Sequence, residues 1–75
     1  MLEQTKFVIY KSDSRYSITE CSDSGVRQVF FAEGNVTGDR DVLLRLTQMK
    51  PRDVSIQTYL EKNAGSIITE EKKAG

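Results

Sequence analysis

The sequence predicts an α+β fold, a three-stranded antiparallel β-meander followed by one α-helix packed on it and by a second helix or strand. Three short segments rich in β-branched and aromatic residues, 7–11, 15–21 and 26–33, are separated by short polar turns. Residues 39–50 then carry apolar side chains at the spacing of one helix face. Pro51 ends that helix, so a new element begins after it.

The two predicted hairpins place the apolar side chains of the meander on one face. A first turn over residues 12–15 sets Ile9 opposite Ile18. A second turn over residues 22–25 sets Ile18 opposite Val29. The same turns predict three further cross-strand pairs, which are Phe7 with Glu20, Tyr16 with Phe31, and Glu20 with Arg27. A slip of one residue turns the apolar set to the wrong face, so the agreement of both hairpins supports this register.

The predicted helix begins after Asp39, which suits the N-cap because its carboxylate accepts hydrogen bonds from free backbone N–H groups. Four apolar residues share the inner face of this helix: Val42, Leu43, Leu46 and Met49. This stripe is expected to pack on the apolar face of the meander.

Residues 52–64 admit two interpretations. Alternating apolar residues from Val54 to Leu60 suit a strand. Pro51 before the segment and Gly65 after it suit a helix with a glycine stop. We favour the helix because its terminal signals are independent of the pattern of the apolar face.

The 75 residues are expected to form one small domain over residues 1–66, with a flexible tail over 67–75.

The chain has 11 basic and 11 acidic residues, so it lacks the general attraction to nucleic-acid phosphates that a basic protein has. Its single cysteine, Cys21, forms no intramolecular disulfide, and the sequence starts without an apolar signal segment. These features predict a cytoplasmic protein.

The composition argues against catalysis. The chain has no histidine, which excludes the Ser-His-Asp and Cys-His arrangements that activate a nucleophile near neutral pH. Cys21 lacks a second cysteine for a zinc or redox pair, and helix capping explains Asp39 and Asp41. We therefore expect no enzyme activity, no cofactor and no metal site.

The second face of the predicted meander presents two aromatic residues, Tyr10 and Phe30, on either side of Ser17. Either the carboxy-terminal segment folds across this face and buries both rings, or the rings stay exposed. Exposed rings anchor a protein partner or stack nucleic-acid bases.

Three residues after the meander complete the candidate surface. Leu44 points away from the inner stripe of the predicted helix, so either a second helix covers it or it faces a partner. Arg45 and Arg52 either interact with the carboxyl end of the helix or orient a partner.

These observations predict a small non-enzymatic regulatory or inhibitory protein that acts through protein–protein contact. The predicted contact residues are Tyr10, Phe30, Leu44, Arg45 and Arg52. Small accessory proteins of bacteria and their phages are similar in size and composition, although this similarity involves no motif. The predicted partner is an unidentified protein, and a homodimer is a second form of the same prediction.

The alternative prediction is a nucleic-acid-binding module that uses the three-stranded sheet. The order of elements over residues 7–50 resembles that of the DNA-binding domains of plant AP2-type factors and of some phage and transposon integrases. The resemblance rests on element order alone and implies that the sheet enters the major groove. Arg15 and Arg27 are then the candidate contacts, but the zero net charge and the few other basic strand residues argue against this function.

Overall fold

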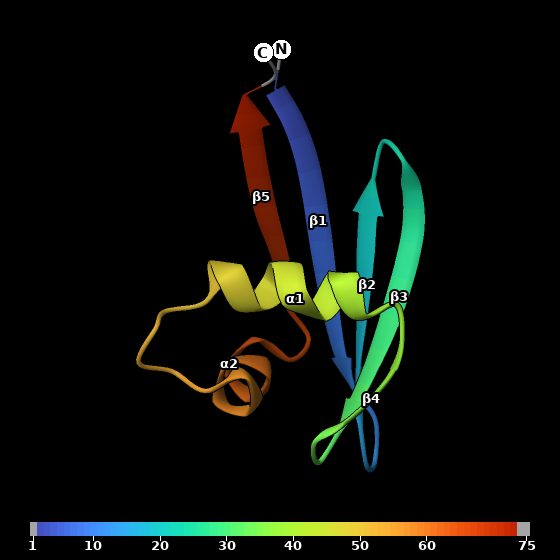
Figure 1. The fold of residues 1–75 in the computed structure, drawn as a ribbon, viewed down its shortest axis with the longest axis vertical. Coiled ribbons are helices and arrows are strands. Elements are labelled where there is room, and N and C mark those ends of the chain that lie inside the picture. The colour runs from blue at the N-terminus through green and yellow to red at the C-terminus, as the bar shows by residue number, and fades with distance from the viewer. Residues whose placement is uncertain (1, 74–75) are drawn as a thin grey trace.

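The computed structural model describes residues 2–73, with the side chains of residues 4–70, and contains a five-stranded antiparallel sheet and two helices. The strands are β1 (Leu2–Lys11), β2 (Tyr16–Ser22), β3 (Gly25–Ala32), β4 (Asn35–Gly38) and β5 (Ile67–Lys73), and the helices are α1 (Arg40–Met49) and α2 (Ile56–Asn63). The sheet order is β4-β3-β2-β1-β5, and α1 crosses one face of the sheet (Figure 1). The predicted α+β fold is confirmed, with a larger sheet than expected.

The register of the first three strands matches the predicted hairpins. The structure pairs Ile9 with Ile18, and Ile18 with Val29. The other predicted pairs are also present: Phe7 with Glu20, Tyr16 with Phe31, and Glu20 with Arg27. Gly25 has the positive φ of 128° that the second turn requires, where a side chain is strained. The meander is therefore the central part of the sheet.

Strand β5 corrects the expectation of a flexible tail. Residues 67–73 pair with β1, and Ile68 lies opposite Phe7. Ile68 packs against the core from this edge position, while the backbone groups of β5 complete the hydrogen bonding of β1. The remainder of the expected tail, residues 74–75, lies outside the described residues.

Strand β4 lies between the predicted meander and α1. Residues 35–38 pair with the end of β3, and Val36 lies opposite Phe31. Gly38, at the end of β4, has a φ of 91°, and a Cβ there would lie 2.8 Å from the backbone oxygen of Gln28. Glycine thus allows the chain to pass close to β3 before it enters α1.

Both helices start at a side-chain cap. The carboxylate of Asp39 accepts a hydrogen bond from the N–H of Asp41 at the start of α1, as predicted. The hydroxyl of Ser55 accepts one from the N–H of Thr58 at the start of α2. Residues 56–63 are helical, so the favoured interpretation of this segment is confirmed and the strand alternative is wrong.

The core lies between one face of the sheet and the two helices. Its buried side chains are Phe7, Ile9, Tyr16, Ile18, Val29, Phe31, Val42, Leu46 and Leu60. The first six come from the meander, the next two from α1 and the last from α2. Because both helices contribute to this single cluster, they lie on the same face, and the opposite face of the sheet has no helix among the described elements.

Candidate binding surfaces

The sheet face opposite the helices, here called the open face, is exposed and apolar in large part. Side chains alternate along each strand, so the residues that flank the buried ones point outward. The large apolar residues on this face are Val8, Tyr10, Val26, Phe30 and Ile67, of which Phe30 is partly buried and the other four are exposed. Tyr10, Val26 and Ile67 are 65%, 68% and 64% exposed, respectively. Val8 and Tyr10 on β1 are neighbours of Ile67 on β5, and adjacent exposed apolar side chains of this kind are typical of binding surfaces.

Two aromatic rings form a row across the open face. Tyr10 pairs with Ser17, and Ser17 pairs with Phe30, so two strand spacings, about 10 Å, separate the rings along the sheet. The guanidinium carbon of Arg15 lies 4.5 Å from the centroid of the Phe30 ring, which is a cation–π contact. The predicted position of both rings on the second face of the meander is confirmed.

The charged side chains described on the open face are basic. Among its described side chains none is a carboxylate, and Lys6 on β1 is basic. Arg15, in the turn between β1 and β2, adds a second positive charge beside Phe30. A partner with apolar groups at the centre of its contact and acidic groups at its rim therefore complements this face.

The carboxy-terminal segment does not cover the open face. It forms β5 at the edge of the sheet, and Ile67, opposite Val8, adds another exposed apolar side chain to the same face. The interpretation in which this segment buries Tyr10 and Phe30 is wrong for the described residues.

The other predicted contact residues lie apart from the open face. Leu44 lies on α1, on the opposite side of the sheet, and is 56% exposed, so α2 does not cover it as one interpretation expected. Arg52 is exposed in the connection between the two helices. The five predicted residues therefore do not form one surface, and only Tyr10 and Phe30 share a face.

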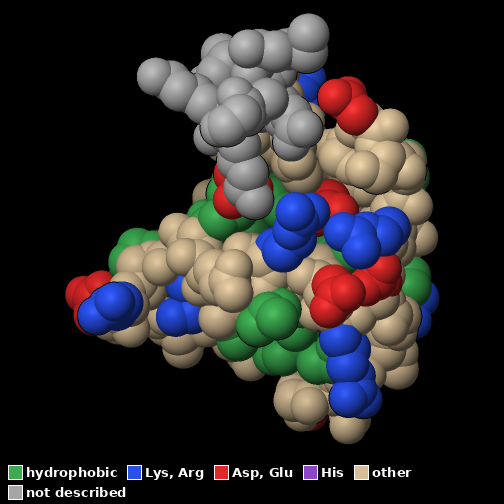
Figure 2. Space-filling model, turned by 45° about the horizontal axis from the view of Figure 1, so that its top comes forward, with side chains coloured by type: hydrophobic (Ala, Val, Ile, Leu, Met, Phe, Trp, Pro, Cys, Tyr) green, Lys and Arg blue, Asp and Glu red, His purple; other side chains and the backbone are tan. Residues whose placement is uncertain are grey.

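Arg45 binds a buried carboxylate within the chain. Its Nη1 donates to Oε2 of Glu20 at 2.9 Å, and Nη2 of Arg27 donates to Oε1 of Glu20 at 2.7 Å. Glu20 is 1% exposed. Nη1 of Arg27 also lies 3.5 Å from Oδ2 of Asp39, the N-cap residue of α1. Acidic and basic groups of β2, β3, α1 and its N-cap therefore form one cluster. Figure 2 shows basic and acidic side chains gathered beside a hydrophobic patch on this side of the molecule.

The two arginines keep Glu20 ionised. Burial of the carboxylate raises the pKa of Glu20, but the hydrogen bonds and positive charges of Arg27 and Arg45 outweigh that effect and lower the pKa below its ordinary value of 4.5. The sequence predicted the cross-strand pair of Glu20 and Arg27, but it did not reveal that Glu20 is buried or that Arg45 reaches it.

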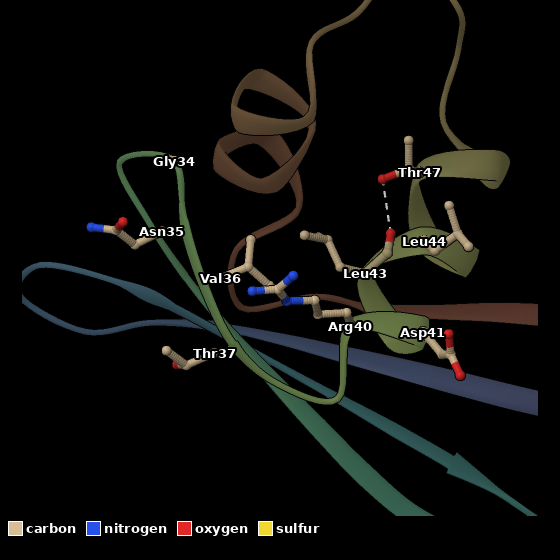
Figure 3. Close-up of a pocket in the computed structure, with 9 residues that line it drawn as sticks. All are labelled: Gly34, Asn35, Val36, Thr37, Arg40, Asp41, Leu43, Leu44 and Thr47. Carbon is tan, nitrogen blue, oxygen red and sulfur yellow. Dashed lines mark hydrogen bonds between the residues drawn. The ribbon is translucent and has the colours of Figure 1, made fainter.

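A groove of about 840 Å³ lies between β4 and α1 and is the second candidate binding surface. Its apolar lining consists of Val36 on β4 and Leu43 and Leu44 on α1. Arg40 and Leu43 point from the helix toward Val36, whereas Asp41 points away from them (Figure 3). Sequence reasoning identified Leu44 as an unpaired apolar residue but did not place β4 beside it.

The comparisons with known proteins assign no family to this chain. No protein-family model, no curated protein and no solved structure matches it. No helix among the described residues is long and apolar enough to span a membrane.

Proposed function

We propose that this chain is a small non-enzymatic regulatory or inhibitory protein that binds another protein through the open face. The observation that carries the proposal is the exposure of Tyr10, Val26 and Ile67 on a sheet face that neither described helix covers. A 75-residue protein with one such face acts by occupying or stabilising a surface of its partner.

The aromatic residues are the proposed anchors. Tyr and Phe side chains bury large areas with few rotatable bonds, and such anchors supply most of the binding energy of protein interfaces. Tyr10 and Phe30 lie on paired strands near the turn between β1 and β2, so little conformational freedom is lost when they bind. Arg15 lies over the Phe30 ring, and Lys6 lies on the same face of β1 as Tyr10, so both favour an acidic rim on the partner.

A second candidate function is binding of single-stranded nucleic acid on the same face. The observation that favours it is the row of two rings with Arg15 stacked on Phe30, because bases stack on aromatic rings and on guanidinium groups. The small number of basic residues on the face makes it the second choice, since phosphate contacts supply most non-specific affinity.

The test is affinity capture from a nuclease-treated lysate of the source organism. The parent chain is compared with the double variant Tyr10→Thr/Phe30→Thr, in which threonine keeps a high strand propensity while the rings are removed. Lys62→Gln, an exposed change on α2, is the matched control.

We expect the parent and Lys62→Gln to capture a polypeptide in a stoichiometric amount, and the double variant to lose it. The proposal is overturned if the double variant retains the same polypeptide, or if no captured polypeptide depends on the two rings. Capture of nucleic acid in the untreated lysate, abolished by nuclease, supports the second candidate instead.

A further inference from the structure

The groove between β4 and α1 lies away from the open face and has its own chemistry. Val36 and Leu43 are partly buried, and Leu44 is 56% exposed, so the groove offers apolar surface to water. The hydroxyl of Thr47 on its wall already donates to the backbone oxygen of Leu43 at 2.8 Å (Figure 3). A ligand therefore meets apolar groups here without having to satisfy that hydroxyl.

Arg40 is the basic group of the groove, and Asp41, the other charged lining residue, points away from Val36 and Leu43 (Figure 3). Arg40 is the first residue of α1, where a positive charge is disfavoured by the helix dipole. Its guanidinium extends toward Val36, beside Leu43 (Figure 3). Among the described residues Arg40 has no ion-pair partner, in contrast to Arg27 and Arg45. An exposed and unpaired arginine beside apolar side chains complements a ligand that joins an apolar group to a carboxylate.

We infer that this groove binds a segment of a partner polypeptide in which a large apolar side chain adjoins Asp or Glu. The apolar side chain lies between Val36 and Leu43 and contacts Leu44, and the carboxylate accepts hydrogen bonds from Arg40. The groove is a surface channel between a hairpin and a helix, so a small ligand would keep much of its surface in water, whereas a polypeptide covers the channel.

This site is independent of the proposed function of the open face. The two surfaces lie on opposite sides of the sheet, since α1 lines the groove and both described helices pack on the face opposite the open face. The chain is therefore able to contact two segments of one partner, or two partners, at once. Variants of either surface test that surface alone.

The test is selection of random twelve-residue peptides displayed on phage against the full chain, followed by affinity measurement with the selected peptides as synthetic probes. We expect enriched peptides to place a large apolar residue next to Asp or Glu. We expect Arg40→Gln to weaken their binding about tenfold or more, because it removes a charge-assisted hydrogen bond. Leu44→Ser is expected to weaken it as well, and peptide addition is expected to shift the backbone amide NMR signals of residues 34–47.

Three controls make the result specific. Arg52→Gln removes an exposed arginine outside the groove, and Gln48→Ser changes an exposed residue one turn beyond Leu44, so both are expected to bind the peptides as the parent does. The open-face variant Tyr10→Thr/Phe30→Thr is also expected to bind them normally, which separates this inference from the proposed function.

The inference is overturned if selection enriches no peptide with this apolar and acidic pair, or if Arg40→Gln and Leu44→Ser bind the selected peptides as tightly as the parent. It is also overturned if addition of the peptide shifts the backbone amide NMR signals of open-face residues instead of those of residues 34–47. Equal binding of N-acetyl-leucine, a small apolar carboxylate, shows that the ligand is a small molecule and contradicts the polypeptide assignment.

Discussion

Nη1 of Arg45 lies 2.9 Å from Oε2 of Glu20, although 25 positions separate the two residues in the chain. Arg45 belongs to α1 and Glu20 to β2, so this contact joins the helix to the sheet. The other carboxylate oxygen accepts hydrogen bonds from Nε and Nη2 of Arg27 at 3.1 and 2.7 Å. One buried acidic side chain thus connects three elements, and its charge is compensated by two arginines.

Glu20→Gln is expected to lower the free energy of unfolding by about 1–3 kcal/mol. The neutral amide weakens the charge-assisted hydrogen bonds that this buried side chain accepts from Arg27 and Arg45. Urea denaturation of the two proteins measures the difference. Glu33→Gln, in the exposed turn between β3 and β4, is the matched control and is expected to change stability by less than about 0.5 kcal/mol. Equal effects of the two substitutions would show that the Glu20 cluster contributes no specific stability.

Acid is expected to remove the contribution of Glu20. The arginines lower its pKa in the folded state below the ordinary value of 4.5, so ionised Glu20 favours folding. This contribution is complete above pH 4.5 and disappears as the pH falls through the lower pKa of the folded state. The difference in unfolding free energy between the parent and Glu20→Gln is therefore expected to shrink below pH 4.5. A difference that grows on acidification contradicts the sign of this pKa shift.

Two leucines on α1 are expected to respond differently to truncation. Leu46 is fully buried in the core, and Leu44 is 56% exposed. We expect Leu46→Ala to lower the unfolding free energy by about 2–5 kcal/mol because it leaves a cavity. Leu44→Ala is expected to stay within about 0.5 kcal/mol of the parent. Comparable losses, measured by urea denaturation, would mean that the helix packs with a different face toward the sheet.

Alanine substitutions at two glycines with similar φ values separate the effect of backbone strain from that of a steric clash. Gly34 and Gly38 have φ values of 88° and 91°, so alanine is strained at both positions. A Cβ at position 38 would also lie 2.8 Å from the backbone oxygen of Gln28, whereas a Cβ at position 34 meets nothing within 4 Å. Gly38→Ala is therefore expected to destabilise the protein by about 1 kcal/mol or more beyond Gly34→Ala. Thermal unfolding checks the order, and a larger loss at position 34 contradicts the approach of β4 to β3.

The sequence predicted the meander well because its register is determined locally. Two short turns and the alternation of apolar residues allow one pairing in which Phe7, Ile18 and Val29 share a face. The cap at Asp39 and the stop after α2 at Gly65 were also predicted from single residues with well-defined conformational preferences.

The edge strands escaped prediction because their pairing is determined by the rest of the sheet. Strand β5 has two adjacent apolar residues followed by a charged run, and of its described apolar side chains Ile68 alone packs against the core. Strand β4 has four residues, two of which, Asn35 and Gly38, are typical of loops. Each becomes a strand because a longer neighbour presents unpaired backbone groups to it.

The predicted contact residues were separated by tertiary structure. Arg45 precedes the buried Leu46 on α1, and no local pattern shows that the helix crosses β2 at the level of Glu20. Leu44 was expected to need either a second helix or a partner, and α2 instead contributes Leu60 to the core. Tyr10 and Phe30 were placed correctly because strand alternation alone determines their face.

The dissociation constant of the captured protein partner tests the role of the open face most directly. Calorimetric titration of the purified partner with the parent, with Tyr10→Thr/Phe30→Thr and with Lys62→Gln compares the three chains under one condition. We expect the double variant to bind about 30-fold more weakly or worse, as loss of aromatic anchors does, and Lys62→Gln to bind as the parent does. Equal affinities of the parent and the double variant, with both folded, would contradict binding through the open face.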